Sequence, residues 1–266
     1  MSNFHFAFQS IIPVRKSAGD AAEMVSQLLF GDVVEVLAED RHWRHVRNQA
    51  DGYEGWVDRK LLLPADAGWV ADIIGWEYVL PPHLVCTTSL YGQEAPLPLT
   101  MGCRIPVMKG VPAGDTLEVK LGAWSISVPR KALGKGPDAS PATLAQVAAQ
   151  YLGAPYLWGG KTLWGIDCSG FMQVIHAFCG KQLPRDAYQQ AEMPGDNIAF
   201  EDRQAGDLAF FANDKGKVTH VGLILPEGRI RHASGYVHDD WLRKEGIFGL
   251  STQLQTHKLC SIKRIH

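Results

Sequence analysis

The chain has 266 residues, of which 46% are hydrophobic and 20% charged, and Lys and Arg (26) nearly balance Asp and Glu (28). This composition is typical of a soluble globular protein of roughly two domains, and it excludes an intrinsically disordered chain. The formal net charge of −2 and the lack of a Lys/Arg block argue against a nucleic-acid-binding protein.

The N-terminal residues contain no basic segment followed by a long apolar run, which a secretory signal would have. No stretch of the chain approaches the roughly 18 consecutive apolar residues of a membrane-spanning helix. We therefore expect a cytoplasmic protein without a membrane partner. The five cysteines show no CxxC spacing and are odd in number, so neither a zinc ribbon nor a complete disulfide framework is predicted.

Up to about residue 135, short β-branched or alternating runs are separated by Gly, Pro, Asn and Asp, a pattern of strands and turns. Strands are expected at residues 33–37, 43–46, 55–57, 84–86, 116–119 and 124–128. Residues 31–37 and 102–108 both consist of a glycine followed by such a run. This weak internal repeat predicts two β-modules, residues 1–66 and 67–135, that are small enough to depend on packing against each other.

A linker rich in Gly and Pro at residues 131–141 precedes a third domain, residues 136–266. Ser140 and Pro141 predict the start of a helix over residues 140–152, which Gly153 would end. A second helix is predicted at residues 168–179, followed by strands at 207–211, 220–225 and 230–233. Helices followed by a run of strands indicate an α+β domain.

Cys168 is predicted to lie in the first turn of the second helix, directly after Asp167, a good N-cap residue. Unpaired backbone N–H groups and the helix dipole lower a thiol pKa at this position and favour the nucleophilic thiolate. The alternative is a buried cysteine that acts only as a small hydrophobic residue.

A thiolate nucleophile needs a base, and that base needs an orienting group. His220 and His232 lie on two predicted strands joined by a turn at residues 226–228, so their side chains are expected on one face, with one imidazole pairing with the thiol and the other fixing its tautomer. The remaining histidines are expected to have structural roles only: His5, His42, His45, His83, His176, His238, His257 and His266.

Six short motifs occur in order in this third domain: Tyr-Leu-Trp-Gly-Gly, Asp-Cys-Ser-Gly-Phe, Leu-Pro-Arg-Asp, Ala-Gly-Asp-Leu-Ala-Phe-Phe, His-Val-Gly-Leu-Ile-Leu and Ile-Arg-His-Ala. Together they resemble the NlpC-type cysteine peptidases, a circularly permuted papain-like family that acts on peptidoglycan peptides. The resemblance implies that Cys168 is the nucleophile, His220 the general base and His232 the orienting residue. The backbone N–H of Cys168 and Tyr156 are then the candidate oxyanion donors.

The two β-modules resemble bacterial SH3 domains, and their combination with this peptidase domain is similar to cytoplasmic γ-D-glutamyl-L-diamino acid endopeptidases. That resemblance implies hydrolysis of the γ-D-Glu–diamino acid bond of free murein tri- or tetrapeptides that carry N-terminal L-Ala, in cell-wall recycling. It assigns Glu23, Tyr53 and Asp186 to the alanine amine. Next to Asp186, relatives often carry a hydroxyl residue where this chain has Ala187. Trp158, Asp167 and Ser169 match positions at the wall of the cleft and the D-Glu end, although Trp158 could equally be a core residue.

The expected architecture is therefore two small SH3-like β-barrels followed by an α+β papain-like cysteine peptidase domain, a monomer without metal or cofactor. The third residue of the substrate, diaminopimelate or lysine, stays open. Two other functions compete: a non-catalytic cell-wall-binding protein, and a thiol acyltransferase on a papain-like fold. The first predicts loss of Cys168 or a histidine, and the second a membrane anchor. No HExxH pattern supports a metal hydrolase.

Overall fold

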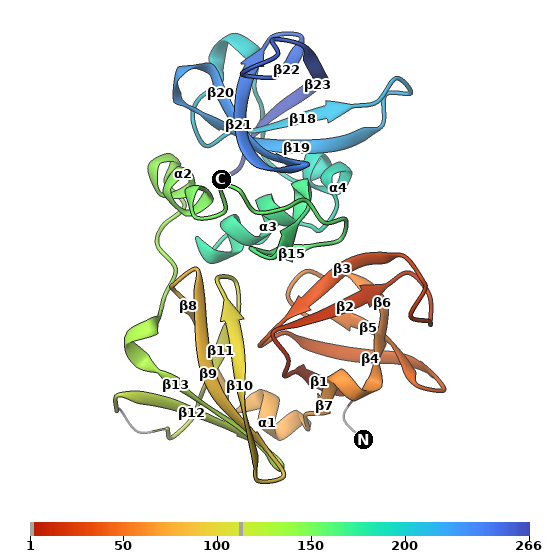
Figure 1. Cartoon of the computed structure of the whole chain (residues 1–266), viewed down its shortest axis with the longest axis vertical. Helices are drawn as coiled ribbons and strands as arrows, with labels where there is room; N and C mark the ends of the chain where they lie inside the picture. The colour runs from red at the N-terminus through yellow and green to blue at the C-terminus, as the bar shows by residue number, and fades with distance from the viewer. Residues whose placement is uncertain (1–2, 112–113) are drawn as a thin grey trace. The chain divides into compact units, whose positions relative to one another are not determined.

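The computed structural model describes residues 3–111 and 114–266, and the chain divides into two compact units, Met1–Gly136 and Pro137–His266 (Figure 1). Each unit is described by itself. Within the described ranges, none of the helices combines the length and apolarity that crossing a bilayer requires.

The first half of the N-terminal unit is an antiparallel seven-stranded sheet with the order β3-β2-β6-β5-β4-β1-β7. Its strands are β1 (Phe4–Ala7), β2 (Ile11–Arg15), β3 (Met24–Leu29), β4 (Val33–Asp40), β5 (Trp43–Asn48), β6 (Glu54–Asp58) and β7 (Leu62–Pro64). The strands predicted at 33–37, 43–46 and 55–57 are confirmed as parts of β4, β5 and β6. Alternate residues of these strands, among them Val34, Val46 and Val57, face a shared apolar core.

The second half of this unit consists of helix α1 and two further sheets with the orders β10-β9-β13-β12 and β11-β8-β14. The elements are α1 (Ala67–Ala71), β8 (Ile73–Val79), β9 (His83–Leu90), β10 (Gln93–Thr100), β11 (Arg104–Met108), β12 (Thr116–Leu121), β13 (Trp124–Pro129) and β14 (Leu133–Gly134). The predicted strands at 84–86, 116–119 and 124–128 are confirmed as parts of β9, β12 and β13. That this half is a second SH3-like barrel stays a prediction.

The two halves of the N-terminal unit share one apolar core. The rings of Phe6 and Phe30, from the first half, lie with centroids 5.6 and 5.8 Å from that of Trp124, from the second half. Gly31 and Gly102, the glycines that open the internal repeat, both have positive φ angles (94° and 97°), which only glycine adopts readily. The repeat therefore encodes the same tight turn before β4 and before β11.

The C-terminal unit contains three helices and a seven-stranded sheet with the order β17-β23-β18-β19-β20-β21-β22, in which an additional β22–β23 pairing closes six strands into a barrel (Figure 1). The helices are α2 (Pro141–Ala149), α3 (Cys168–Phe178) and α4 (Ala187–Glu192). The strands are β15 (Lys161–Thr162), β16 (Gly165–Ile166), β17 (Asp196–Asn197), β18 (Leu208–Ala212), β19 (Val218–Leu225), β20 (Arg229–Ser234), β21 (Tyr236–Arg243), β22 (Gly246–Phe248) and β23 (Gln255–Arg264).

Helix α3 is the central helix of this unit, and every residue in it except Ala177 is buried. It packs against β19 and β20, the two strands that carry His220 and His232. The sequence predicts its start correctly and its end one residue too late. Helix α2 begins as predicted, with Ser140 as N-cap and Pro141 in the first turn, but it ends at Ala149. The chain then continues in turns to Gly153, whose φ is +83°.

Candidate active site

Cys168 opens helix α3 and lies against strand β19. Asp167 is the N-cap residue, and its Oδ1 accepts a hydrogen bond from the Gly170 N–H (2.7 Å). The Cys168 side chain is only 5% exposed, and its Sγ lies 3.9 Å from the carbonyl oxygen of Thr219, the residue before His220. The predicted position of the thiol in the first helical turn is confirmed.

Arg185 holds the segment around Cys168 through a buried ion pair. Its guanidinium donates to both carboxylate oxygens of Asp167 (3.0 and 2.6 Å) and to Ser169 Oγ (2.9 Å), and it is 2% exposed. Asp167 Oδ2 also accepts from the Gly159 N–H (2.8 Å). Asp167 and Ser169 thus fix the loop and the helix start, whereas their contact with a substrate stays a prediction. Arg185 was not among the predicted site residues.

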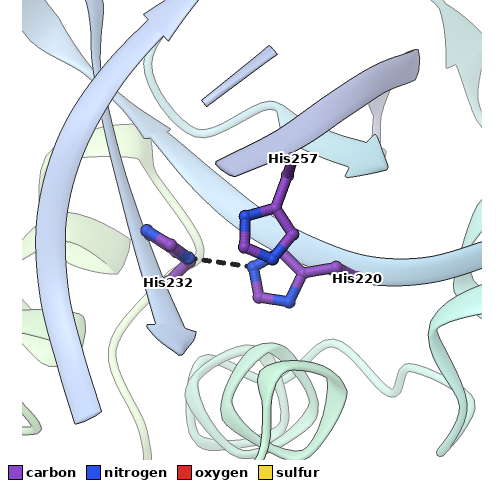
Figure 2. Close-up of side chains that lie close together, drawn as sticks. All are labelled: His220, His232 and His257. Atoms are coloured by element: carbon purple, nitrogen blue, oxygen red, sulfur yellow. Dashed lines mark hydrogen bonds between the residues drawn. The ribbon is translucent and has the colours of Figure 1, made fainter. Parts of the chain in front are cut away.

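His220, His232 and Asp240 form a hydrogen-bonded chain across strands β19, β20 and β21 (Figure 2 shows the two histidines). His220 Nε2 lies 2.9 Å from His232 Nδ1, and His232 Nε2 lies 3.3 Å from Asp240 Oδ2. The predicted placement of both histidines on one face of an antiparallel strand pair is confirmed.

The Asp240 carboxylate, at the end of these hydrogen bonds, determines which ring nitrogens of His220 and His232 carry a proton. Because a carboxylate only accepts hydrogen bonds, His232 donates to Asp240 from Nε2, and His232 Nδ1 must accept from His220 Nε2–H. The Nδ1 atom of His220, directed away from His232 in Figure 2, is then the unprotonated nitrogen. This arrangement makes His220 a base with one fixed orientation.

His257 completes the cluster, although the sequence analysis gave it a structural role. Its ring stacks on that of His220, with centroids 4.1 Å apart and an interplanar angle of 21° (Figure 2). His238, also expected to be structural only, lies 3.2 Å from Asp240 Oδ2. No local pattern identifies His257, because β23 reaches the site through its pairings with β18, about 50 residues earlier, and with β22.

The imidazoles of His220, His232 and His257 offer nitrogens within 4.8 Å of one another, a spacing that a metal ion could use, and so do the ligand atoms of His232, His238 and Asp240. The hydrogen bonds among His220, His232, His238 and Asp240, together with the stacking of His257 on His220, account for this spacing.

Burial dominates the ionisation of the thiol and the base. Desolvation, with a further contribution from Asp167, raises the pKa of Cys168 to about 12. Desolvation and the neighbouring imidazoles lower the pKa of His220 well below 6.5. The predicted lowering of the Cys168 pKa is therefore wrong, because burial outweighs the effect of the helix N-terminus. Both shifts favour a neutral thiol and a neutral imidazole before attack, so we expect the thiol proton to pass to His220 as the sulfur attacks.

We expect kcat/KM to stay high as the pH falls through 6.5 and to decline only at more acidic pH. A base must be unprotonated, and the pKa of His220 lies below its ordinary value, so that protonation sets in later. A pH profile of kcat/KM from pH 4 to 8 measures this acidic decline. Because the His257 ring also lowers the pKa of His220, His257→Phe should move the midpoint of the decline to higher pH. A midpoint at or above 6.5 in the unchanged protein would contradict the assignment.

Two hollows lie beside His257, which lines both of them. The first has a volume of about 290 Å³ and is lined by Tyr156, Thr219, His220, Ala233, Ser234, Gly235 and His257. The second, of about 430 Å³, is lined by Phe211, Ala212, Asn213, Asp214, Thr219, Gln255, Thr256, His257 and Lys258. Both are lined by Thr219 and His257. Trp158 is 58% exposed, which excludes the alternative of a core residue.

The residues predicted for the alanine amine lie in different parts of the chain. Asp186 is the N-cap of α4, and its backbone N–H donates to Gln189 Oε1 (3.1 Å). Glu23 precedes β3 in the N-terminal unit and forms an exposed ion pair with Lys16 (3.3 Å). Tyr53 precedes β6 in the same unit. Their meeting around one ligand stays a prediction.

Two family profiles match separate parts of the chain. The profile of the NlpC/P60 family matches residues 153–247, which include Cys168, His220 and His232. The profile of the bacterial dipeptidyl-peptidase SH3 domain matches residues 14–62.

Two curated relatives from Bacillus carry the name gamma-D-glutamyl-L-lysine dipeptidyl-peptidase. The Bacillus subtilis protein is 30% identical over 90% of this chain and 80% of its own length. The Bacillus cereus protein is 28% identical over 80% of this chain and 68% of its own length. A crystal structure of an NlpC/P60 family protein from Bacillus cereus matches the fold with a TM-score of 0.79 at 21% identity, over 98% of this chain and 99% of that one.

Proposed function

The chain belongs to the NlpC/P60 family of cysteine peptidases, and we propose that it hydrolyses the bond between γ-D-Glu and the L-diamino acid of free murein peptides that begin with L-Ala. One observation carries the proposal: a thiol in the first turn of α3 lies beside the strand that begins the His220–His232–Asp240 chain. The names of the Bacillus relatives support this bond as the target.

The reaction proceeds through a thioester. Cys168 Sγ attacks the γ-carbonyl carbon of D-Glu while its proton passes to His220 Nδ1. The C–N bond then breaks, and the diamino acid leaves with the proton that His220 returns to its amine. Water, deprotonated by His220, hydrolyses the thioester, which releases L-Ala-γ-D-Glu and restores the thiol. His232 and Asp240 keep His220 in the required tautomer throughout.

The developing oxyanion is stabilised at the N-terminus of α3. We assign the backbone N–H of Cys168 as one donor and the Tyr156 hydroxyl as the second. Burial raises the pKa of Tyr156, so this hydroxyl keeps its proton and can donate it in a hydrogen bond. The L-Ala-γ-D-Glu part occupies the hollow lined by Tyr156, with Trp158 and Ser169 at its D-Glu end.

Asp186 supplies a carboxylate for the N-terminal ammonium of the substrate, whereas the parts of Glu23 and Tyr53, which belong to the N-terminal unit, stay predictions. A peptide still attached to glycan lacks this ammonium, so the enzyme acts on released peptides. The setting is then recycling of cell-wall peptides in the cytoplasm by a monomer that needs no metal or cofactor.

The proposed bond is tested by mass spectrometry of the products formed from L-Ala-γ-D-Glu-diaminopimelate. L-Ala-γ-D-Glu and free diaminopimelate are the expected products. Release of L-Ala alone, or an unchanged peptide at high enzyme concentration, would refute the proposal.

We also expect the enzyme to require the free amine. N-acetylation of L-Ala removes the charge and leaves carboxylates facing a neutral amide, and such a loss typically costs about 2–5 kcal/mol. Because the Glu23 side chain is 45% exposed, we expect the lower end of this range, a kcat/KM about 30-fold lower for the acetylated peptide.

Glu23→Gln and Tyr53→Phe should each reduce this preference. Glu201→Gln is the matched control, because Glu201 is an exposed carboxylate that pairs with Lys244 on the surface of the C-terminal unit. Equal kcat/KM values for the free and the acetylated peptide in the unchanged enzyme would show that the enzyme does not recognise the free amine.

A further inference from the structure

His232, His238 and Asp240, on the paired strands β20 and β21, direct three ligand atoms toward one another. His232 Nε2 lies 3.3 Å and His238 Nε2 3.2 Å from the same oxygen, Asp240 Oδ2, and all three atoms lie within 4.8 Å of one another. A tetrahedral zinc ion with bonds of about 2.0–2.2 Å keeps its ligand atoms about 3.3 Å or slightly more apart. Two of the three separations therefore already have nearly the length that such an ion requires.

The other polar atoms of His238 and Asp240 have partners that suit a metal site. His238 Nδ1 lies 2.9 Å from the Tyr236 carbonyl oxygen, which only accepts, so Nδ1 carries a proton. A neutral His238 then directs the lone pair of Nε2 at the Asp240 carboxylate, and only a second proton or a metal ion makes this contact favourable. Asp240 Oδ1 accepts from the Leu250 N–H (2.9 Å). Ligands of metal ions are commonly fixed in this way through their second polar atom.

Solvent reaches this cluster at His238. The His238 side chain is 23% exposed, whereas the side chains of His232 and Asp240 are 1% and 9% exposed. A metal ion can therefore approach past His238 and keep a water molecule as its fourth ligand. Among the described residues, those that line the two hollows include none of these three. An ion bound here leaves both hollows open to a peptide.

We propose that His232, His238 and Asp240 bind a zinc ion that inhibits the peptidase. Two imidazoles and a carboxylate are a ligand set for zinc, whereas magnesium and calcium ions prefer oxygen ligands. The neighbouring set of His220, His232 and His257 suits an ion less well, because the His220 and His257 rings are stacked and their lone pairs, which lie in the ring planes, do not converge. The inhibition, but not the binding, rests on the proposed function.

Inhibition follows from the hydrogen bond between the two catalytic imidazoles. With zinc on His232 Nε2, the proton of this ring must lie on Nδ1, which then donates to His220 Nε2 (2.9 Å). His220 therefore carries its own proton on Nδ1, the atom that has to accept the proton of Cys168. The protons balance: one moves from His220 to His232, His232 Nε2 releases one and His220 Nδ1 takes one up. Both rings stay neutral, but the base has no free nitrogen for the thiol.

Binding is tested by isothermal titration calorimetry of zinc chloride into full-length Cys168→Ala protein, in which no thiolate at position 168 can hold the ion. One zinc ion per chain is expected. Adding His238→Asn removes Nε2 but keeps an amide N–H for the Tyr236 carbonyl, and it should weaken binding at least about 100-fold, because even the loss of an outer partner costs 10–100-fold. His266→Asn is the control, since His266 is an exposed imidazole of the same unit that pairs with Asp196. Unchanged affinity after His238→Asn would overturn the site.

Inhibition is tested by the steady-state kinetics of the enzyme with Cys168 on L-Ala-γ-D-Glu-diaminopimelate, with and without zinc. Zinc should lower kcat and leave KM unchanged, and His238→Asn should keep the zinc-free activity and resist the inhibition. Zinc inhibition that raises KM and persists in His238→Asn would assign the ion to Cys168 and overturn the inference, as would full activity of the zinc-bound enzyme. If the zinc-free enzyme does not cleave the peptide, the proposed function fails, whereas calorimetry still decides the metal site.

Discussion

Replacing Cys168 by alanine is expected to reduce kcat by at least about 10⁴-fold while the fold stays intact. No other group at the start of α3 can form the thioester, so loss of the sulfur removes the first step of the reaction. The substitution is small, and alanine favours the first helical turn, so we expect a change of only about 1 kcal/mol in the free energy of unfolding. Steady-state kinetics and urea denaturation of the same preparation measure the two quantities.

Cys260→Ser is the matched control, because Cys260 is an exposed thiol on β23 of the same unit. It should retain full activity. The double variant Cys168→Ala/His220→Ala should be no slower than Cys168→Ala alone, because members of one catalytic unit are not additive. Substantial turnover by Cys168→Ala would transfer the nucleophile to another residue and refute the proposed mechanism.

The parts of the site that could be predicted from the sequence are those that local structure creates. Asp167 and Cys168 adjoin in the chain, and an N-cap residue followed by an apolar periodic run defines the helix start. His220 and His232 are joined by a short turn, so the alternation of side chains along two antiparallel strands brings them to one face.

The parts that could not be predicted depend on distant segments. His257 reaches His220 because β23 pairs with β18, and Arg185 reaches Asp167 from 18 residues further along the chain. The ionisation of Cys168 also depends on how deeply the helix start is buried, which no local pattern reveals. The same holds for the N-terminal unit. Local sequence patterns predict its turns and strands, whereas the core that Phe6 and Trp124 share depends on contacts between residues far apart in the sequence.

The ion pair between Arg185 and Asp167 leads to the largest expected effect on stability. Arg185→Met is expected to lower the free energy of unfolding of the C-terminal unit by about 3–5 kcal/mol, because it leaves a buried carboxylate without its cation. Urea denaturation, followed by a signal from this unit, measures the loss. Lys244→Met breaks an exposed pair in the same unit and should change stability little.

A double-variant cycle separates the ion pair from the packing of the arginine side chain. Asp167→Asn keeps an oxygen that can accept from the Gly170 N–H but removes the negative charge. Arg185→Met should therefore cost much less in the Asp167→Asn background than in the unchanged protein. Equal costs in the two backgrounds would show that Arg185 stabilises the unit by packing alone. Because the same carboxylate caps the helix that begins with Cys168, an unequal cost would also show that the Arg185 charge stabilises the start of this helix.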